Sequence, residues 1–227
     1  MLKAIVFDFD GTLIESADIK TAAFAELFRN FPDHLEAILK YHAAYAGVSR
    51  YVKFRTIYKD ILKQPLSIME ERQLGDAFSK LVFDRVRQCP LVPGAAEFLD
   101  KVAACMRCFI ASGTPEGELR EIVDRRGLKK YFAGIYGAPA SKQEILRRIC
   151  REHALSPSQM LCVGDAPSDM EAAQAEGVAF LGRTRGNQWV PLLPGIATGG
   201  FIDFEDLASR WDSTITRLGF SRCADSI

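Results

Sequence analysis

Two aspartates separated by a single residue, Asp8 and Asp10, follow the apolar run Ala4–Phe7 near the start of the chain. A continuous apolar run of this kind is typical of a strand that is buried on both faces of a parallel sheet. A carboxylate at the end of such a strand is costly unless a cation or hydrogen bonds compensate its charge. The simpler alternative is a strand that ends in an Asp-Gly turn, and Asp-Gly alone is a weak signal. The rest of the chain decides between the two.

Two more aspartates, Asp165 and Asp169, follow another short apolar run at 160–163. Because the carboxyl ends of parallel strands share one edge of a sheet, where open α/β folds bind ligands, the four carboxylates can converge there. Carboxylates this close repel one another unless cations intervene. Mg²⁺ prefers carboxylate and water oxygens and keeps positions open for a phosphate, so the pattern predicts a magnesium site. Taken alone, Asp165 and Asp169 would only favour a helix N-terminus.

A serine and a lysine complete this set of strand-end residues. Ser112 follows the apolar run 107–111, and Lys142 opens a later helix. Ser112 and the backbone N–H groups of Gly113 and Thr114, near a helix N-terminus, are suited to holding phosphate oxygens, and Lys142 adds a positive charge. Thr114 also fits the N-cap of a helix that has a proline at its first position. Alone, Ser112 would be a turn residue and Lys142 an exposed lysine.

Short apolar runs alternate with helical patterns over most of the chain, which implies parallel crossovers and a doubly wound α/β sheet. The stretch 14–88 interrupts this alternation with four helical patterns and no strand. We therefore predict an α-helical cap domain at residues 15–89, inserted into a core domain formed by residues 1–14 and 90–227. The expected strands are 4–7, 107–111, 132–136, 160–163 and 178–181, and the expected closing helix is 204–218.

The bulk composition is that of an ordinary globular protein. Of 227 residues 48% are hydrophobic, and 29 Lys and Arg balance 29 Asp and Glu. This charge balance indicates neither a nucleic-acid nor a membrane partner. No apolar run approaches the ~18 residues of a membrane helix. The N-terminus lacks the pattern of a secretory signal. The six scattered cysteines are typical of reduced thiols, so we expect a cytoplasmic location.

Four motifs of the chain resemble, in order and spacing, those of the haloacid dehalogenase superfamily. They are Asp-Phe-Asp-Gly-Thr-Leu at 8–13, Ser-Gly-Thr at 112–114, Lys142, and Gly-Asp-x-x-x-Asp at 164–169. The helical insert resembles the cap of the phosphoglycolate phosphatase and β-phosphoglucomutase branch. The resemblance covers residues 2 to about 181 and implies a Rossmann-like core and a hydrolase that uses Mg²⁺.

The resemblance also implies roles for the aspartates. Asp8 matches the nucleophile, which attacks phosphorus and forms an aspartyl-phosphate. Asp10 matches the general acid/base, which protonates the leaving oxygen and then activates water. Asp8, Asp165 and the backbone carbonyl of Asp10 would bind Mg²⁺, and Asp169 would be a supporting ligand or a residue that contacts the ligands without binding the metal.

Two further pairs of residues would face the substrate. Ser112 and Lys142 match the family's pair that counters the charge on the transferring phosphoryl group. In the cap, the glycine-bearing break at Gly47 resembles the substrate-specificity loop of this branch, so Arg50 or Lys53 could meet an anionic group on the leaving portion. A solvated basic helix face is the alternative for both.

The leading hypothesis is a Mg²⁺-dependent phosphatase that acts on a small phosphorylated metabolite, with no nucleic-acid or membrane partner. Retention of Asp10 favours phosphoryl chemistry, because dehalogenases of this superfamily lack the second aspartate. The alternatives are a β-phosphoglucomutase-type phosphomutase, a phosphonate hydrolase in which Lys53 forms a Schiff base, and a non-catalytic binding relative. The complete motif set argues against the last of these.

Three further residues outside the motifs have simpler expected roles. We expect His42 to be structural or exposed, and Arg183 and Arg185 to be exposed to solvent. The Gly/Pro-rich segment 183–200 indicates no clear element, and the tail after Gly219 is expected to be disordered.

Overall fold

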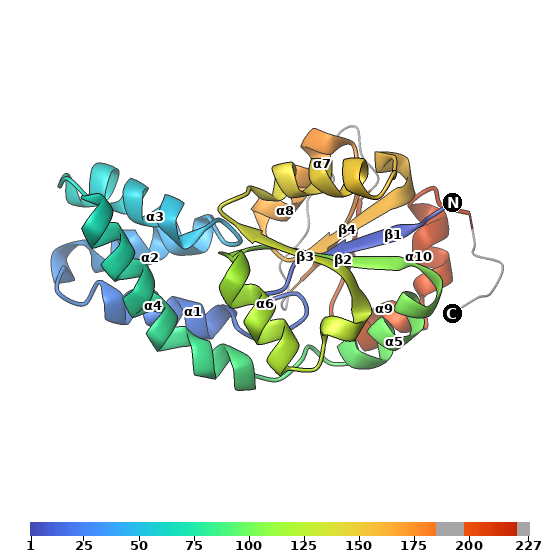
Figure 1. Cartoon of the computed structure of the whole chain (residues 1–227), viewed down its shortest axis with the longest axis horizontal. Helices are drawn as coiled ribbons and strands as arrows, with labels where there is room; N and C mark the ends of the chain where they lie inside the picture. Colours follow the sequence, from blue (N-terminus) through green and yellow to red (C-terminus); the bar gives the residue numbers. More distant parts are fainter. Residues whose placement is uncertain (185–197, 222–227) are drawn as a thin grey trace.

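The core of the computed structural model, which describes residues 1–184 and 198–221, is a six-stranded sheet (Figure 1). The strands are β1 (Ala4–Phe7), β2 (Arg107–Pro115), β3 (Phe132–Ala138), β4 (Met160–Gly164), β5 (Ala179–Arg183) and β6 (Thr198–Phe201). They lie in the order β3-β2-β1-β4-β5-β6, and every neighbouring pair is parallel. The predicted parallel sheet is confirmed.

Helices cover both faces of the sheet, as expected of a doubly wound fold. They are α5 (Ala95–Cys105), α6 (Glu116–Arg125), α7 (Lys142–Glu152), α8 (Pro167–Glu176), α9 (Phe204–Ser209) and α10 (Trp211–Arg217). Helices α7 and α8 cover one face, and α5, α6, α9 and α10 cover the other (Figure 1). Because side chains alternate along a strand, Ala4 and Val6 of β1 join the first layer, whereas Ile5 and Phe7 join the second.

The chain between β1 and α5 forms a lobe of helices beside the sheet, which we call the helical lobe (Figure 1). It comprises α1 (Ala17–Leu27), α2 (Leu35–Ala44), α3 (Arg50–Thr56) with the π-helical continuation Ile57–Leu62, and α4 (Ile68–Gln88). Aromatic rings fill its interior: Phe24 lies 5.1 Å from Phe78 and 5.8 Å from Phe54 between ring centroids. The two segments that join the lobe to the core pair with each other at Ile14 and Leu91.

Three elements differ from the expectations. Strand β2 continues through Pro115, so the predicted Thr114 cap is wrong, and α6 begins at Glu116 without a side-chain cap. Strand β6 was not expected because glycines, which have low strand propensity, make up half of it. The expected closing helix is two helices, α9 and α10, that meet at Arg210.

Arg183 is buried, with 8% of its surface exposed, so the expectation of an exposed side chain is wrong. From the end of β5 its guanidinium donates to the carbonyl oxygen of Gly11 at 2.7 Å and pairs with Glu15 at 2.5 Å. These contacts satisfy the buried charge and hold the turn that follows Asp10. Arg185 and the last six residues, on which two other expectations fall, lie outside the described ranges. Of the tail after Gly219, Phe220 is described and packs against the core.

Two general features agree with the composition. Within residues 1–184 and 198–221, no helix is both long and apolar enough to cross a membrane. The cysteines in these ranges are all free thiols, including Cys105 and Cys108, which lie only three positions apart.

Candidate functional site

The four aspartates converge at the carboxyl edge of the sheet. Asp8 and Asp10 follow β1, and Asp165 and Asp169 follow β4. Strands β1 and β4 are neighbours at the point where the strand order changes direction, which is where open α/β sheets bind ligands. Asp8, Asp165 and Asp169 each place a carboxylate oxygen within 4.8 Å of the others.

Lys142, at the start of α7, supplies a positive charge to this carboxylate cluster. Its ammonium nitrogen lies 3.1 Å from Asp8 Oδ1 and donates to Asp169 Oδ1 at 2.6 Å. Burial works against the charged amine, but the carboxylates of Asp169 and Asp8 outweigh it and raise the pKa of Lys142. The lysine is therefore held as a cation beside the Asp8 carboxylate.

The Asp8 carboxylate is fully buried and is left short of partners. Burial raises its pKa well above the ordinary value, Lys142 opposes this rise, and the charges of Asp169, Asp165 and Asp10 add to it. Apart from the ion pair of Oδ1 with Lys142, neither of its oxygens accepts a hydrogen bond from the described residues, although both are inaccessible to solvent. A bound cation would compensate buried carboxylate oxygens that have too few hydrogen-bond donors. The donor set of Asp8, Asp165 and Asp169 therefore fits a hard divalent cation such as Mg²⁺.

The side chain of Asp10 points instead into a network of hydrogen-bond donors. Its Oδ1 accepts from Ser16 at 2.8 Å, and its Oδ2 accepts from Thr114 at 2.8 Å and from Ser112 at 3.3 Å. The ammonium of Lys20 lies 2.5 Å from Oδ2 and also donates to Thr114 at 2.8 Å. Burial favours a higher pKa for Asp10, but Lys20 and the hydroxyl donors outweigh it, and the pKa is lowered.

Lys20 is a site residue that the sequence patterns do not predict. It lies near the start of α1, the first helix of the helical lobe. From the sequence alone, a lysine at this position indicates only a solvent-exposed helix face. The available signal was its position ten residues after Asp10, close to the junction between lobe and core. Its partner Thr114 is 94 positions away, so the contact is visible only in the folded chain.

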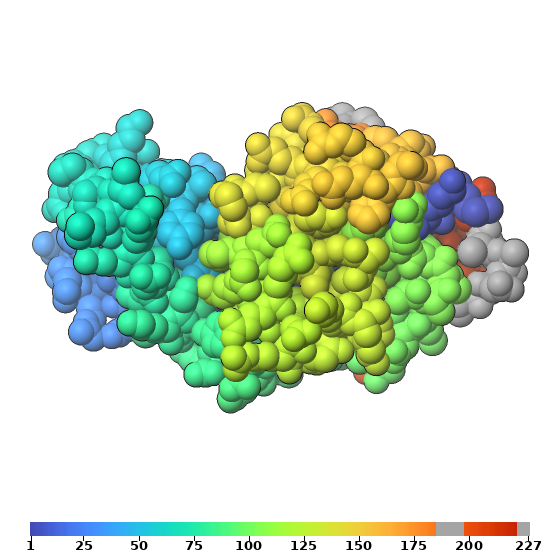
Figure 2. All heavy atoms as spheres, viewed as in Figure 1, coloured from blue at the N-terminus to red at the C-terminus, as the bar shows by residue number. Residues whose placement is uncertain are grey.

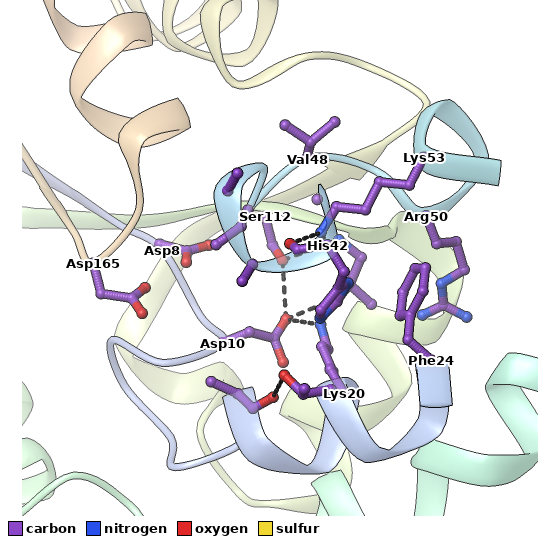
Figure 3. A pocket seen from close by; sticks show the side chains of 18 of the residues that line it. Asp8, Asp10, Lys20, Phe24, His42, Val48, Arg50, Lys53, Ser112 and Asp165 are labelled. Atoms are coloured by element: carbon purple, nitrogen blue, oxygen red, sulfur yellow. Dashed lines mark hydrogen bonds and ion pairs between the residues drawn. The ribbon is translucent and has the colours of Figure 1, made fainter. Parts of the chain in front are cut away.

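A cavity of about 570 Å³ separates the core residues from the helical lobe. Asp8, Asp10 and Ser112 line its core side, and Lys53 and Arg50 line the lobe side. Figure 3 shows Asp8 and Asp165 at one end of the cavity and Arg50 toward the other, with Lys53 in between. The structure thus brings both predicted lobe residues and most of the predicted core residues to one cavity. Lys142 and Asp169 do not line it, and Lys142 pairs with Asp8 beside it.

The loop at Gly47 packs directly on the core. A Cβ atom at Gly47, where φ is +75°, would lie 2.3 Å from Ser168 Oγ and 2.8 Å from Lys142 Nζ. A Cβ atom at Gly113 would in turn lie 2.3 Å from the carbonyl oxygen of Gly47. Only glycine fits this close approach. A second cavity of about 410 Å³ lies between this loop and the segment 139–143, where the space-filling view shows a hollow between the helical lobe and the core (Figure 2).

Arg50 and Lys53 lie in different surroundings. Arg50 is 4% exposed and its guanidinium pairs with Glu118 of α6. Lys53, 3% exposed, donates to the carbonyl oxygen of His42 at 3.1 Å and lies 3.2 Å from His42 Nδ1. Burial, with smaller contributions from the charges of Lys20 and Lys142, lowers the pKa of Lys53 to about 7.

His42 is a structural partner of Lys53. Of the two expectations for this residue, structural or exposed, the first is the one that holds. It is 8% exposed, and its ring centroid lies 4.0 Å from that of Phe24. Burial, then the charges of Lys53 and Lys20, lower its pKa to about 3. A neutral imidazole is the form that can accept a hydrogen bond from the Lys53 ammonium.

Comparisons with known proteins agree with this geometry. Residues 5–182 match the family described as haloacid dehalogenase-like hydrolase. A phosphoglycolate phosphatase of Synechococcus elongatus is 27% identical over 82% of this chain and 85% of that protein, and one of Rhodospirillum rubrum is 25% identical over 93% and 90%. The structure of CbbY from Rhodobacter sphaeroides in complex with phosphate superposes on this structure with a TM-score of 0.73. The superposition covers 97% of this chain and all of the CbbY chain, and the two sequences are 19% identical.

The lowered pKa of Lys53 predicts a pH-dependent effect of Lys53→Met on stability. In the unfolded chain the amine titrates near its ordinary value of 10.5, so between pH 7 and 10.5 the unfolded state binds more protons and wild-type stability rises with pH. The cost of burying the charged amine is complete below pH 7. The substitution Lys53→Met removes this cost. Relative to the wild type, the variant should therefore be more stabilised, or less destabilised, at pH 7 than at pH 9.5.

Urea unfolding of both proteins at the two pH values measures this difference. Lys40→Met, at an exposed position of α2, is the matched control and should give the same small change at both. An effect of Lys53→Met that is independent of pH would contradict the lowered pKa.

Proposed function

This chain belongs to the haloacid dehalogenase-like hydrolase family and is a phosphatase of that family, and we propose that it hydrolyses a small phosphorylated carboxylate through an aspartyl-phosphate on Asp8. The buried carboxylate of Asp8 carries the proposal: it faces the cavity, and among the described residues Lys142 is the one cation paired with it. We further propose Mg²⁺ as the cofactor, held by Asp8, Asp165, Asp169 and the backbone carbonyl of Asp10.

The first step transfers the phosphoryl group to the protein. A carboxylate oxygen of Asp8 attacks phosphorus, the bond from phosphorus to the ester oxygen breaks, and that oxygen takes a proton from Asp10. The negative charge of the bound phosphate would raise the pKa of Asp10, which Lys20 lowers in the free protein, and so favour the protonated form. Lys20, 2.5 Å from Asp10, stabilises the carboxylate that this proton transfer leaves behind. Mg²⁺, when bound, would neutralise the clustered carboxylates and the charge on the phosphoryl oxygens.

The second step regenerates the enzyme. A water molecule gives its proton to the Asp10 carboxylate and attacks phosphorus, so that inorganic phosphate leaves and Asp8 is free again. Lys142, which pairs with Asp8, and the Ser112 hydroxyl, which donates to Asp10, would stabilise the charge that develops on the phosphoryl oxygens. The Gly47 loop over Lys142 and Gly113 covers this region of the site.

The lobe side of the cavity supports a carboxylate on the leaving portion. Lys53 lines the cavity, and its hydrogen-bonding partner His42 is neutral. An anion beside Lys53 would favour the ammonium form, so binding above pH 7 would take up a proton. The relatives named phosphoglycolate phosphatases support 2-phosphoglycolate as the first substrate to test.

The nucleophile and the cation are tested together. Asp8→Asn should lower kcat for p-nitrophenyl phosphate by about 10⁴-fold or more, because an amide cannot form the covalent intermediate. EDTA should abolish wild-type activity and added Mg²⁺ should restore it. Asp84→Asn, at an exposed carboxylate of α4, is the control and should keep full activity. Full activity of Asp8→Asn, or turnover in EDTA, would contradict the mechanism.

The role of Lys53 is tested by comparing two substrates. Lys53→Met should lower kcat/KM for 2-phosphoglycolate about 10-fold to 100-fold, as expected for the loss of a charge-assisted hydrogen bond, and Lys53→Arg should restore part of it. The same variants should change kcat/KM for p-nitrophenyl phosphate less than about 3-fold, because this substrate has no carboxylate. Equal losses on the two substrates would remove the proposed contact.

A second candidate, hydrolysis of a 2-oxoalkylphosphonate, is favoured by the lowered pKa of Lys53. The neutral amine would condense with the substrate carbonyl and release water. The iminium would then accept the electron pair of the carbon–phosphorus bond as the phosphoryl group passes to Asp8, and the enamine would hydrolyse.

Borohydride trapping distinguishes the two candidates. The enzyme is incubated with 2-oxoethylphosphonate and sodium borohydride, and peptides are analysed by mass spectrometry. The leading proposal expects no adduct and no loss of phosphatase activity. A reduced adduct on Lys53, absent from Lys53→Arg, would instead favour phosphonate hydrolysis.

A further inference from the structure

The helical lobe brings three cationic side chains to the cavity, and each has a different partner. Lys20 pairs with Asp10 and Arg50 pairs with Glu118, so each of these charges faces a carboxylate. Lys53 has the neutral His42 as its hydrogen-bonding partner. The three charges therefore do not act equally on a ligand in the cavity.

The ion pair between Arg50 and Glu118 is bidentate and buried. Arg50 Nη2 lies 2.7 Å from Glu118 Oε1, and Nη1 lies 3.0 Å from Oε2. Ser79 of α4 joins the pair, since its hydroxyl accepts from Arg50 Nη1 at 2.7 Å and donates to Glu118 Oε2 at 2.6 Å. The side chains of Arg50 and Glu118 are 4% and 12% exposed.

The carboxylate approaches Arg50 from outside the cavity. Arg50 and Phe78 line the cavity, and the guanidinium carbon lies 4.5 Å from the centre of the Phe78 ring. Glu118 is not among the lining residues and comes from α6 of the core. Glu118 thus cancels the charge of a wall residue without occupying the space of the cavity.

We propose that Glu118 is a positioning residue that sets the charge selectivity of the cavity by binding and compensating Arg50. With Arg50 paired, a leaving portion finds one uncompensated cation on the lobe side, Lys53. A singly charged group such as a carboxylate matches this surface, whereas a second phosphate brings more charge than Lys53 offsets. Without the Glu118 charge, Arg50 would face the cavity as a second free cation with phosphate-binding geometry.

This inference rests on the proposed phosphatase function, and its test uses substrates matched in length. One series consists of the phosphate esters of glycolate, 3-hydroxypropionate and 4-hydroxybutyrate. The other consists of the bisphosphates of ethanediol, propanediol and butanediol. For the full-length enzyme, kcat/KM is measured on both series, and the ratio between bisphosphate and carboxylate of the same length reports selectivity.

Glu118→Gln keeps the shape of the side chain and removes its charge. We expect the ratio to rise about 10-fold or more at the best chain length, the effect of one added charge-assisted hydrogen bond. Glu118→Asp should keep a ratio near that of the wild type. The double variant Arg50→Gln/Glu118→Gln should also return toward the wild-type ratio, because it has no arginine to release.

The control is Glu121→Gln, which removes a carboxylate from an exposed ion pair on the same helix. It should leave the ratio unchanged. An unchanged ratio in Glu118→Gln, or an equal fall on both series, would overturn the proposal and leave the pair as a structural link between lobe and core. If the wild type hydrolyses neither series nor p-nitrophenyl phosphate, the proposed function fails instead.

Discussion

The buried cluster of Asp8, Asp169 and Lys142 is the interaction on which the rest of the site depends. Charges this deeply buried are tolerated only when short ion pairs compensate them, and Lys142 reaches both carboxylates within 3.1 Å. Because the three residues come from the end of β1, from α8 and from α7, the ion pairs hold the carboxyl edge of the sheet together. The compensation is incomplete, since among the described residues the oxygens of Asp8 have the Lys142 ion pair and no further hydrogen-bond donor. This incompletely compensated charge makes the Asp8 carboxylate a suitable partner for a cation and for an electrophile. Incomplete compensation of a buried charge is typical of sites where function competes with stability.

The helical lobe completes the site by adding charges from the opposite side. Lys20 reaches Asp10 and Arg50 reaches Glu118, so two ion pairs join the lobe to the core at the cavity. Between them, the Gly47 loop lies so close to Lys142 and Gly113 that no side chain fits. Charges in such a covered cavity interact more strongly than in water. The lobe therefore covers the carboxylates of the core, and under the proposed function it would also select what is attached to the phosphate.

Much of this architecture could be predicted from local patterns. The strand at 4–7, the helix that begins at Lys142 and the parallel alternation follow from short-range signals, and the structure contains all three. The convergence of the four aspartates also follows, because parallel strands must end at one edge. Strand β6 and the division of the closing helix escaped prediction because weak local propensities were overruled by packing against β5 and the core.

The sequence by itself determined which chemistry the core can perform, because the spacing of the motif residues ties each one to a strand end or helix start. Only the tertiary structure decided how the charges are paired. Lys20 meets Thr114 across 94 positions, Arg50 meets Glu118 across 68, and Arg183 meets Glu15 across 168. Thr114, locally a good helix cap, instead donates to Asp10. No local pattern encodes such partners, because an ion pair depends on distance in space, and the fold brings these side chains together only when the lobe packs on the core.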